Sequence, residues 1–188
     1  MKRVFIVHCW EGNPDYCWYP SVKADLEKQG FQVNVPAMPE TAMPKQSLWV
    51  PRLKELIGRP DADTFLVGHS IGCAAIMRYL EQLGDGQEVG GVVFVAGFTD
   101  DLGFPEIHNF FETPLNFSKI RSSSRGFIAI HSDNDPFVDL HYSEVLNEQL
   151  GAEIVLKSGK KHFSGPVDNE ESCVELREVV EAVVAFAK

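Results

Sequence analysis

Short runs rich in Val, Ile and Phe alternate along the chain with longer stretches in which apolar residues recur at helical spacing. Several runs are apolar throughout, which is typical of strands that helices cover on both faces. Six runs are expected to be strands: 4–7, 31–35, 64–67, 91–96, 127–131 and 154–156. Strands that alternate with helices usually form a parallel sheet, so the pattern predicts an α/β protein with about six parallel strands.

The intervening stretches predict five helices, over 21–29, 47–57, 71–83, 136–150 and 170–188. Glycine follows each of the first three, as is common just after a helix C-terminus. Pro51 falls in the second helix, which should begin late or kink there because proline in a helix interior costs about 3 kcal/mol. Residues 97–125 show no clear periodicity. Helices on both faces of the sheet imply a three-layer architecture.

The length of 188 residues and the hydrophobic fraction of 44% suit one core better than two. We therefore expect a single domain over 1–188. The 17 Lys and Arg residues against 27 Asp and Glu residues give a net charge of -10. Nucleic acid is accordingly not an expected partner, because its binding depends on many basic contacts.

The apolar run near the N-terminus becomes polar at His8 after four residues. This is too short for a signal-peptide core or a membrane span. The four cysteines, Cys9, Cys17, Cys73 and Cys173, form no Cys-x-x-Cys pair, so neither a metal site nor a redox dithiol is expected. We expect a cytoplasmic protein with reduced thiols and no membrane contact, as a monomer or a small homo-oligomer.

The sharpest local motif is Gly-His-Ser-Ile-Gly at 68–72, between the apolar run 64–67 and the helix expected from residue 71. This is the context of a nucleophile elbow, whose tight turn needs glycines and holds a serine exposed above the sheet. Ser70 is therefore the candidate nucleophile. His69 is expected to be structural, because neighbouring side chains in such a turn diverge.

A serine hydroxyl becomes a good nucleophile only when a histidine accepts its proton and a carboxylate orients that histidine. In elbow-type enzymes the chain order is Ser, acid, His. His162 lies in a loop after the last expected strand, at the sheet edge where ligands bind, and is the preferred base. The other histidines after the elbow, His108, His131 and His141, fit less well by element or by chain order.

Two aspartates, Asp133 and Asp135, follow the strand expected at 127–131. We choose Asp135 as the acid, because it lies farther along the loop and Pro136 disfavours a helical conformation for it. Asp133 is expected to accept backbone N–H groups in the turn.

The oxyanion hole is expected to combine the backbone N–H of Ile71 with that of Cys9 or Trp10, from the loop after the first strand. Alternatively, His8 and Trp10 pack this loop against the helix that begins near Ser21, and for His8 we favour that interpretation.

One wall of the substrate site is expected to come from phenylalanines of 97–125, unless these form a separate small core under a long loop. They are Phe98, Phe104, Phe110, Phe111 and Phe117. Weaker candidates for the same wall are Trp10, Trp18, Phe137 and Phe163. Since the chain has no room for a large lid, a short or medium acyl chain is expected.

Five segments together resemble the small serine hydrolases related to retinoblastoma-binding protein 9, and especially their bacterial relatives. They are Val7-His8, Cys17-Trp18-Tyr19-Pro20, the elbow with Arg78-Tyr79-Leu80-Glu81, Asp133-Asn134-Asp135-Pro136, and His162-Phe163. The resemblance spans nearly the whole chain. It implies a compact α/β-hydrolase fold without two leading antiparallel strands or a large cap, the triad Ser70, Asp135 and His162, and no cofactor or metal. Relatives often have His-Gly where this chain has His8-Cys9.

These features predict a serine hydrolase that cleaves small carboxylic esters through an acyl-enzyme, with amide or thioester cleavage as variants. The alternative is a hydrolase-like protein-binding module with little turnover. Nucleotide binding is disfavoured, because the first strand precedes His8-Cys9-Trp10-Glu11-Gly12 and not a Gly-x-Gly-x-x-Gly turn, and the sequence has no phosphate-binding loop.

Overall fold

The computed structural model describes residues 1–164 and 173–188. In that part of the chain, six parallel strands form one sheet in the order β2-β1-β3-β4-β5-β6. The strands are β1 (Arg3–Val7), β2 (Gln32–Asn34), β3 (Thr64–His69), β4 (Gly91–Val95), β5 (Phe127–Ser132) and β6 (Glu153–Lys157). Each predicted apolar run overlaps one of these strands, so the prediction of about six parallel strands is confirmed.

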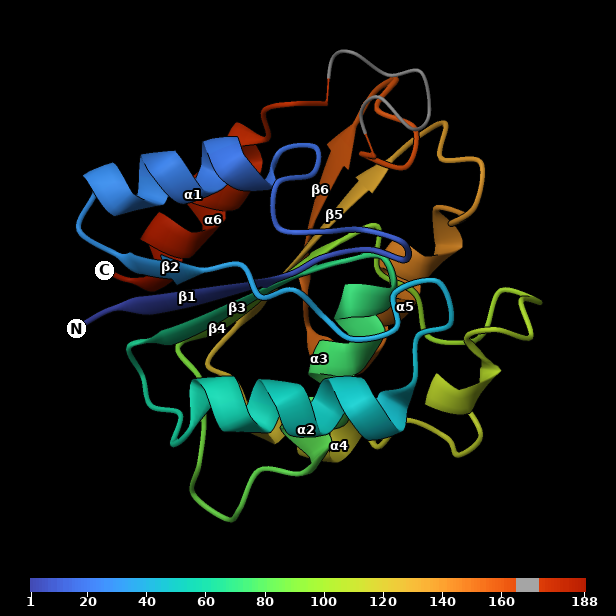
Figure 1. The fold of residues 1–188 in the computed structure, drawn as a ribbon, viewed down its shortest axis with the longest axis horizontal. Helices are drawn as coiled ribbons and strands as arrows, with labels where there is room; N and C mark the ends of the chain where they lie inside the picture. The colour runs from blue at the N-terminus through green and yellow to red at the C-terminus, as the bar shows by residue number, and fades with distance from the viewer. Residues whose placement is uncertain (165–172) are drawn as a thin grey trace.

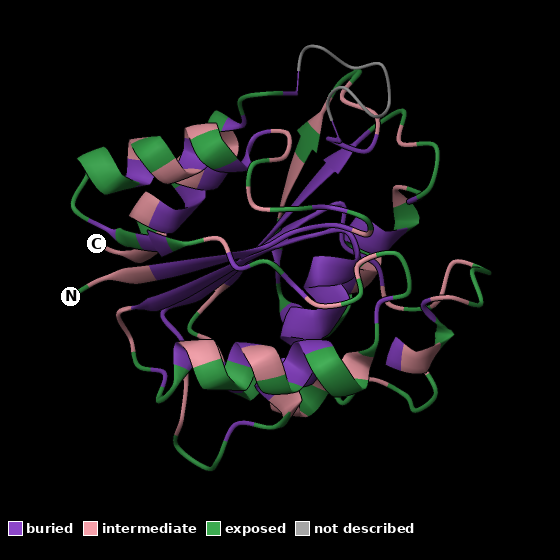
Figure 2. Ribbon diagram, viewed as in Figure 1, coloured by how far each residue is buried: buried purple, intermediate pink, exposed green. Residues whose placement is uncertain are grey.

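Helices cover both faces of the sheet (Figure 1). One face carries α1 (Tyr19–Lys28) and α6 (Arg177–Phe186), and the other carries α2 (Gln46–Ile57), α3 (Ile71–Glu81), α4 (Phe117–Ser122) and α5 (His141–Leu150). Side chains of β3 alternate between the two cores, with Phe65 and Val67 facing α1 and α6 and Leu66 facing α3. The first ten residues of α3 are all buried, as Figure 2 shows for the centre of the fold. The three-layer prediction is confirmed.

Helix α2 begins at Gln46, so the predicted late start at Pro51 is wrong. Proline there removes the hydrogen bond that its nitrogen would donate four residues back and crowds the carbonyl group at that position. Burial of Trp49, Val50 and Leu53 against the core favours the helix despite this loss.

Two other predicted helices begin later than expected. Helix α5 begins at His141, because residues 136–140 form turns in which backbone N–H groups bond to the carboxylates of Asp135 and Asp139. Helix α6 begins at Arg177, after a non-helical stretch in which Cys173 and Leu176 are buried in the core. The first part of the predicted helix 170–188 lies outside the described residues.

The segment 97–125, which showed no pattern in sequence, contains a 3-10 turn (His108–Phe110) and α4. Arg78 of α3 holds this segment in place. Its buried guanidinium donates to the carbonyl oxygens of Phe110 and Thr113 and pairs with Glu81, whose carboxylate accepts the backbone N–H of Asn116. A buried charge is tolerated only when it is paired in this way.

Across the described residues, no helix is long and apolar enough to cross a bilayer.

Candidate functional site

Four loops meet at the edge of the sheet where the strand order reverses. Strand β2 lies outside β1, whereas β4, β5 and β6 follow on the other side of β3. Ligands of open parallel sheets bind at such a reversal, beyond the carboxyl ends of the strands. The first loop (8–12) follows β1, Ser70 follows β3, and the loops after β5 and β6 carry Asp135 and His162.

Ser70, which was predicted to be exposed, is 7% exposed and lies in a strained turn between β3 and α3, with φ 56° and ψ -123°. Residues other than glycine rarely adopt this conformation, and it persists only where the surroundings hold it. A Cβ atom at Gly72 would lie 2.3 Å from the carbonyl oxygen of Val7, and one at Gly68 would lie 2.7 Å from the backbone nitrogen of Cys73. Both positions therefore require glycine, which lets α3 approach the sheet closely enough to form the turn.

The structure brings Ser70, His162 and Asp135 within hydrogen-bond distance of one another. Nε2 of His162 lies 2.9 Å from Oγ of Ser70, and Nδ1 lies 2.9 Å and 3.1 Å from the two carboxylate oxygens of Asp135. Because an ionised carboxylate only accepts, Nδ1 carries the hydrogen and Nε2 presents its lone pair to the serine hydroxyl. The Asp135 side chain is 1% exposed, and its Oδ1 also accepts the backbone N–H groups of Phe137 and Val138.

Consecutive residues of the loop 132–135 hold the loop 159–162. The first three accept backbone N–H groups, Ser132 from Lys160 (2.9 Å), Asp133 from Gly159 (2.8 Å) and Asn134 from Lys161 (2.8 Å). The N–H of Gly159 lowers the pKa of Asp133, which is solvent-exposed and contacts the loop backbone. Of the two aspartates, Asp135 is the one hydrogen-bonded to the His162 ring.

The hydrogen bonds of the backbone N–H groups near Ser70 distinguish between Cys9 and Trp10 as the second donor of the oxyanion hole. The N–H of Cys9 donates to the Tyr19 hydroxyl at 3.0 Å and so already has a partner. Within the described part of the chain, neither the Trp10 nor the Ile71 backbone N–H donates a hydrogen bond. Trp10 and Ile71, which both line the cavity at Ser70, therefore offer the two unpaired donors. In this loop Glu11, and not Cys9, has a positive φ, so a side chain at position 9 causes no strain.

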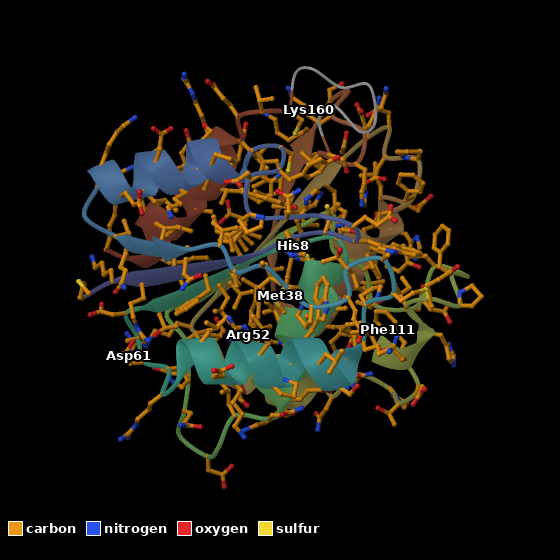
Figure 3. The ribbon with its side chains drawn as sticks, viewed as in Figure 1. His8, Met38, Arg52, Asp61, Phe111 and Lys160 are labelled. Carbon is orange, nitrogen blue, oxygen red and sulfur yellow. The ribbon has the colours of Figure 1, made fainter. Side chains whose placement is uncertain are left out.

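His8 packs the first loop against α2, so the partner predicted for it, the helix near Ser21, is wrong. Its Nε2 accepts the backbone N–H of Met38 at 3.1 Å, and its ring meets Trp49 edge-on at 5.4 Å. Figure 3 shows His8 and Met38 close together. Since a buried imidazole needs partners for both nitrogens, the amide of Met38 and the carbonyl of Cys9 together account for this position. Trp10 instead donates its indole N–H to the carbonyl oxygen of Ala42.

A cavity of about 380 Å³ opens at Ser70. Its apolar wall consists of Trp10, Phe98, Leu102, Phe104, Ile107 and Phe137. Four of these were predicted from sequence. Leu102 and Ile107 were not, because nothing in the irregular stretch 97–125 distinguishes aliphatic residues that face a cavity from those that face the core. Glu11 and Tyr16 also line the cavity.

The other predicted aromatic residues lie outside this cavity. Phe110, Phe111 and Phe117 pack on the core formed by α2 and α3. Trp18 and Phe163 are fully buried on the opposite face, with α1 and α6. The prediction that these five line the wall is corrected accordingly, because none of them lines the cavity and their side chains pack in or against the two cores.

Among residues 1–164 and 173–188, no group of three or more His, Cys, Asp or Glu side chains is placed to hold a metal ion.

Three histidines near the site are buried, and burial lowers the pKa of each. They are His8, His69 and His131. The effect is largest for His69, whose pKa falls to about 3. The folded protein therefore keeps these rings neutral at pH values where the unfolded chain takes up protons.

Acidification from about pH 7.5 to about pH 5 is expected to lower the thermal unfolding midpoint. Because the folded-state pKa values lie below the unfolded ones, the stabilisation is present above about pH 6.5 and is lost as the pH falls toward 3, the folded value of His69. Calorimetry at the two pH values measures the change. The variant His8→Gln lacks one of the three groups and should show a smaller shift, and an equal or larger shift would contradict this explanation.

Comparisons with known proteins show which family the chain resembles. The model of a family described as serine hydrolase matches residues 4–170. The chain is 29% identical over 163 residues to YdeN of Bacillus subtilis, covering 86% of each protein, and 29% identical over 149 residues to the serine hydrolase RBBP9 of Rattus norvegicus, covering 78% of this chain and 77% of RBBP9.

Solved structures support the fold. The crystal structure of the B. subtilis ydeN gene product superimposes with a TM-score of 0.92 at 28% identity, covering 100% of this chain and 99% of that one. A carboxylesterase structure from the thaumarchaeon Nitrososphaera gargenis superimposes with a TM-score of 0.71 at 14% identity, covering 99% and 89%. The predicted compact α/β-hydrolase fold is thereby confirmed.

Proposed function

We propose that this chain, which belongs to the serine hydrolase family, hydrolyses small carboxylic esters with Ser70 as nucleophile, His162 as general base and acid, and Asp135 as the group that orients His162. The observation that carries the proposal is the hydrogen-bonded series from Asp135 through Nδ1 and Nε2 of His162 to Oγ of Ser70. Amides and thioesters would follow the same course.

The arrangement supports a two-stage reaction. Oγ of Ser70 attacks the ester carbonyl carbon while Nε2 of His162 accepts the hydroxyl proton, and the tetrahedral intermediate then expels the alcohol, which takes that proton. Water next attacks the acyl-enzyme, giving a proton to Nε2, and the acid is released as the serine recovers its hydrogen. Asp135 stabilises the imidazolium that forms at each stage.

The carbonyl oxygen gains negative charge in both stages. We assign its stabilisation to the backbone N–H groups of Trp10 and Ile71, since the N–H of Cys9 is bonded to the Tyr19 hydroxyl. Removing one such donor typically costs about 10²–10³ in kcat. The N–H of Ile71 also lies at the start of α3, where the helix dipole favours negative charge.

A fluorophosphonate probe tests the proposal against the alternative of a protein-binding module with little turnover. Attack of Ser70 on phosphorus releases fluoride and leaves a stable phosphonyl-serine, which requires an activated hydroxyl. Mass spectrometry of a peptide containing Ser70 is expected to show the adduct. An unlabelled, folded protein that also fails to turn over p-nitrophenyl esters would favour the binding module.

Acyl chains of short or medium length are expected to be the best substrates. The cavity of about 380 Å³ is near the lower end of the range of roughly 300–1,000 Å³ for small-molecule sites. Its wall is apolar, so kcat/KM of p-nitrophenyl esters should rise from acetate to butyrate or octanoate by the gain in buried area. It should fall for palmitate, whose chain exceeds the wall.

The variant Phe104→Ala tests whether this wall binds the acyl chain, because it removes part of the wall. Phe104 is 36% exposed and meets Trp10 edge-on at 5.9 Å, so its loss should lower kcat/KM for octanoate more than for acetate. Equal effects on both esters, or a wild-type preference for palmitate, would show that the acyl group binds elsewhere.

A further inference from the structure

A fully buried pair, Tyr19 and His69, lies directly behind the nucleophile. Tyr19 is the first residue of α1, and His69 is the last residue of β3, next to Ser70. The Tyr19 hydroxyl lies 2.6 Å from Nδ1 of His69 and accepts the backbone N–H of Cys9 at 3.0 Å. Nε2 of His69 lies 2.7 Å from the backbone carbonyl oxygen of His162. Neither side chain lines the cavity at Ser70.

The direction of every bond in this series follows from the group at its end. A carbonyl oxygen only accepts, so Nε2 of His69 carries the ring hydrogen and donates to His162. Nδ1 then has a lone pair and accepts the hydroxyl hydrogen of Tyr19, which leaves the Tyr19 oxygen free to accept from Cys9. Burial, which lowers the pKa of His69 to about 3, keeps the ring in this neutral form.

The series joins the two backbone segments on which the reaction depends. At one end is the backbone N–H of Cys9, one residue before the unpaired N–H of Trp10. At the other is His162, flanked by Lys161 and Phe163 with positive φ values of 44° and 56°. Left-handed residues other than glycine persist only where neighbouring contacts hold them, and the bond from His69 reaches the backbone between these two.

Packing alone does not account for the polar atoms. Trp18 meets the Tyr19 ring edge-on at 4.6 Å and lies 5.6 Å from the His69 ring, so both rings also pack in this core. Burying a hydroxyl and an imidazole is unfavourable unless both are hydrogen-bonded. Here the hydrogen bonds of the pair end on the backbone of Cys9 and of His162.

We propose that Tyr19 and His69 are positioning residues that hold the first loop and the His162 backbone in fixed relation to Ser70, so that the base and the oxyanion donors are preorganised before substrate binds. This inference rests on the proposed esterase function and extends it to two residues that contact neither substrate nor the reacting atoms.

The test compares Tyr19→Phe with Val22→Ala. Tyr19→Phe keeps the ring and removes the hydroxyl. Val22→Ala removes buried side-chain volume from the same helix and the same core without touching the series. For p-nitrophenyl butyrate, Tyr19→Phe is expected to lower kcat about 10- to 100-fold, the scale of small misplacements of reacting groups, with little change in KM. Val22→Ala should lower the unfolding midpoint and leave kcat near the wild-type value.

A second variant and a spectroscopic readout make the result independent of turnover. In wild-type protein the Nδ1 hydrogen of His162 should give a downfield proton resonance. Tyr19→Phe is expected to shift or broaden this resonance, and Val22→Ala is expected to leave it in place.

His69→Gln retains an N–H that can donate to the His162 carbonyl and should lose less activity than His69→Phe. A response of the resonance without any wild-type turnover would reject the esterase function and keep the positioning role. Two results would overturn the positioning role. One is an unchanged kcat and an unchanged resonance in Tyr19→Phe, and the other is an equal loss of kcat in Tyr19→Phe and Val22→Ala.

Discussion

Replacing Ser70 by alanine is expected to reduce kcat on p-nitrophenyl butyrate by about 10⁶-fold, the loss seen when a triad serine is removed. The hydroxyl bonded to Nε2 of His162 at 2.9 Å is the nucleophile that forms the acyl-enzyme in the proposed reaction. Stability should change little, because a single hydrogen bond contributes about 1 kcal/mol. Ser70→Ala should also abolish labelling by a fluorophosphonate.

Ser143→Ala provides the matched control. Ser143 is buried, as Ser70 is, and its hydroxyl makes one hydrogen bond of 2.7 Å, to the carbonyl oxygen of Leu140. Neither Ser143 nor Leu140 lines the cavity at Ser70. Its loss should lower the unfolding midpoint by a comparable amount and leave kcat unchanged. Residual activity of Ser70→Ala close to wild type would remove the basis for the whole mechanism.

The sheet and the position of the elbow could be predicted from sequence because both depend on local pattern. The central apolar runs become strands whose residues face helices on both sides, as Phe65, Leu66 and Val67 do. Parallel strands end at one edge, so the residues that follow β3, β5 and β6 had to come together there. Ser70, Asp135 and His162 accordingly lie within hydrogen-bond distance.

The details that sequence could not supply depend on contacts between distant segments. Whether Cys9 or Trp10 offers a free N–H depends on the hydroxyl of Tyr19, which α1 places over the first loop. Trp18 and Phe163 are aromatic and close in sequence to functional residues, yet both point into the core beneath α1 and α6. Aromatic character alone does not tell a cavity wall from a core.

Helix starts were missed for a similar reason. The turn before α5 forms because the carboxylate of Asp135 accepts the N–H groups of Phe137 and Val138, which a helix starting at Pro136 would leave to other caps. The residue proposed to orient the base thus also delays the helix. Side-chain to backbone bonding of this kind competes with helix formation and is not visible in hydrophobic periodicity.

Asp135→Asn is expected to lower kcat by about 10⁴, the loss seen when a triad histidine is left in the wrong tautomer. The carboxylate accepts the Nδ1 hydrogen of His162, and an amide nitrogen turned toward the ring would donate instead, moving the ring hydrogen to Nε2. His162 could then no longer accept the Ser70 proton. The N–H groups of Phe137 and Val138 bond to Oδ1 and hold the amide oxygen on their side, which directs the amide nitrogen to the ring. Steady-state kinetics on one ester measure the loss.

Asp133→Asn makes the same chemical change two residues earlier. It tests whether an aspartate that contacts the backbone of the loop 159–162 affects kcat. Its carboxylate accepts the backbone N–H of Gly159 at 2.8 Å, a bond that an amide oxygen can also accept, although the N–H of Gly159 favours the ionised form and lowers the pKa of Asp133. We therefore expect a lower unfolding midpoint with kcat within a few-fold of wild type. A larger loss of kcat from Asp133→Asn than from Asp135→Asn would assign the orienting role to the other carboxylate. It would also require the loop 132–135 to rearrange in solution, since of these two carboxylates Asp135 is the one hydrogen-bonded to the His162 ring.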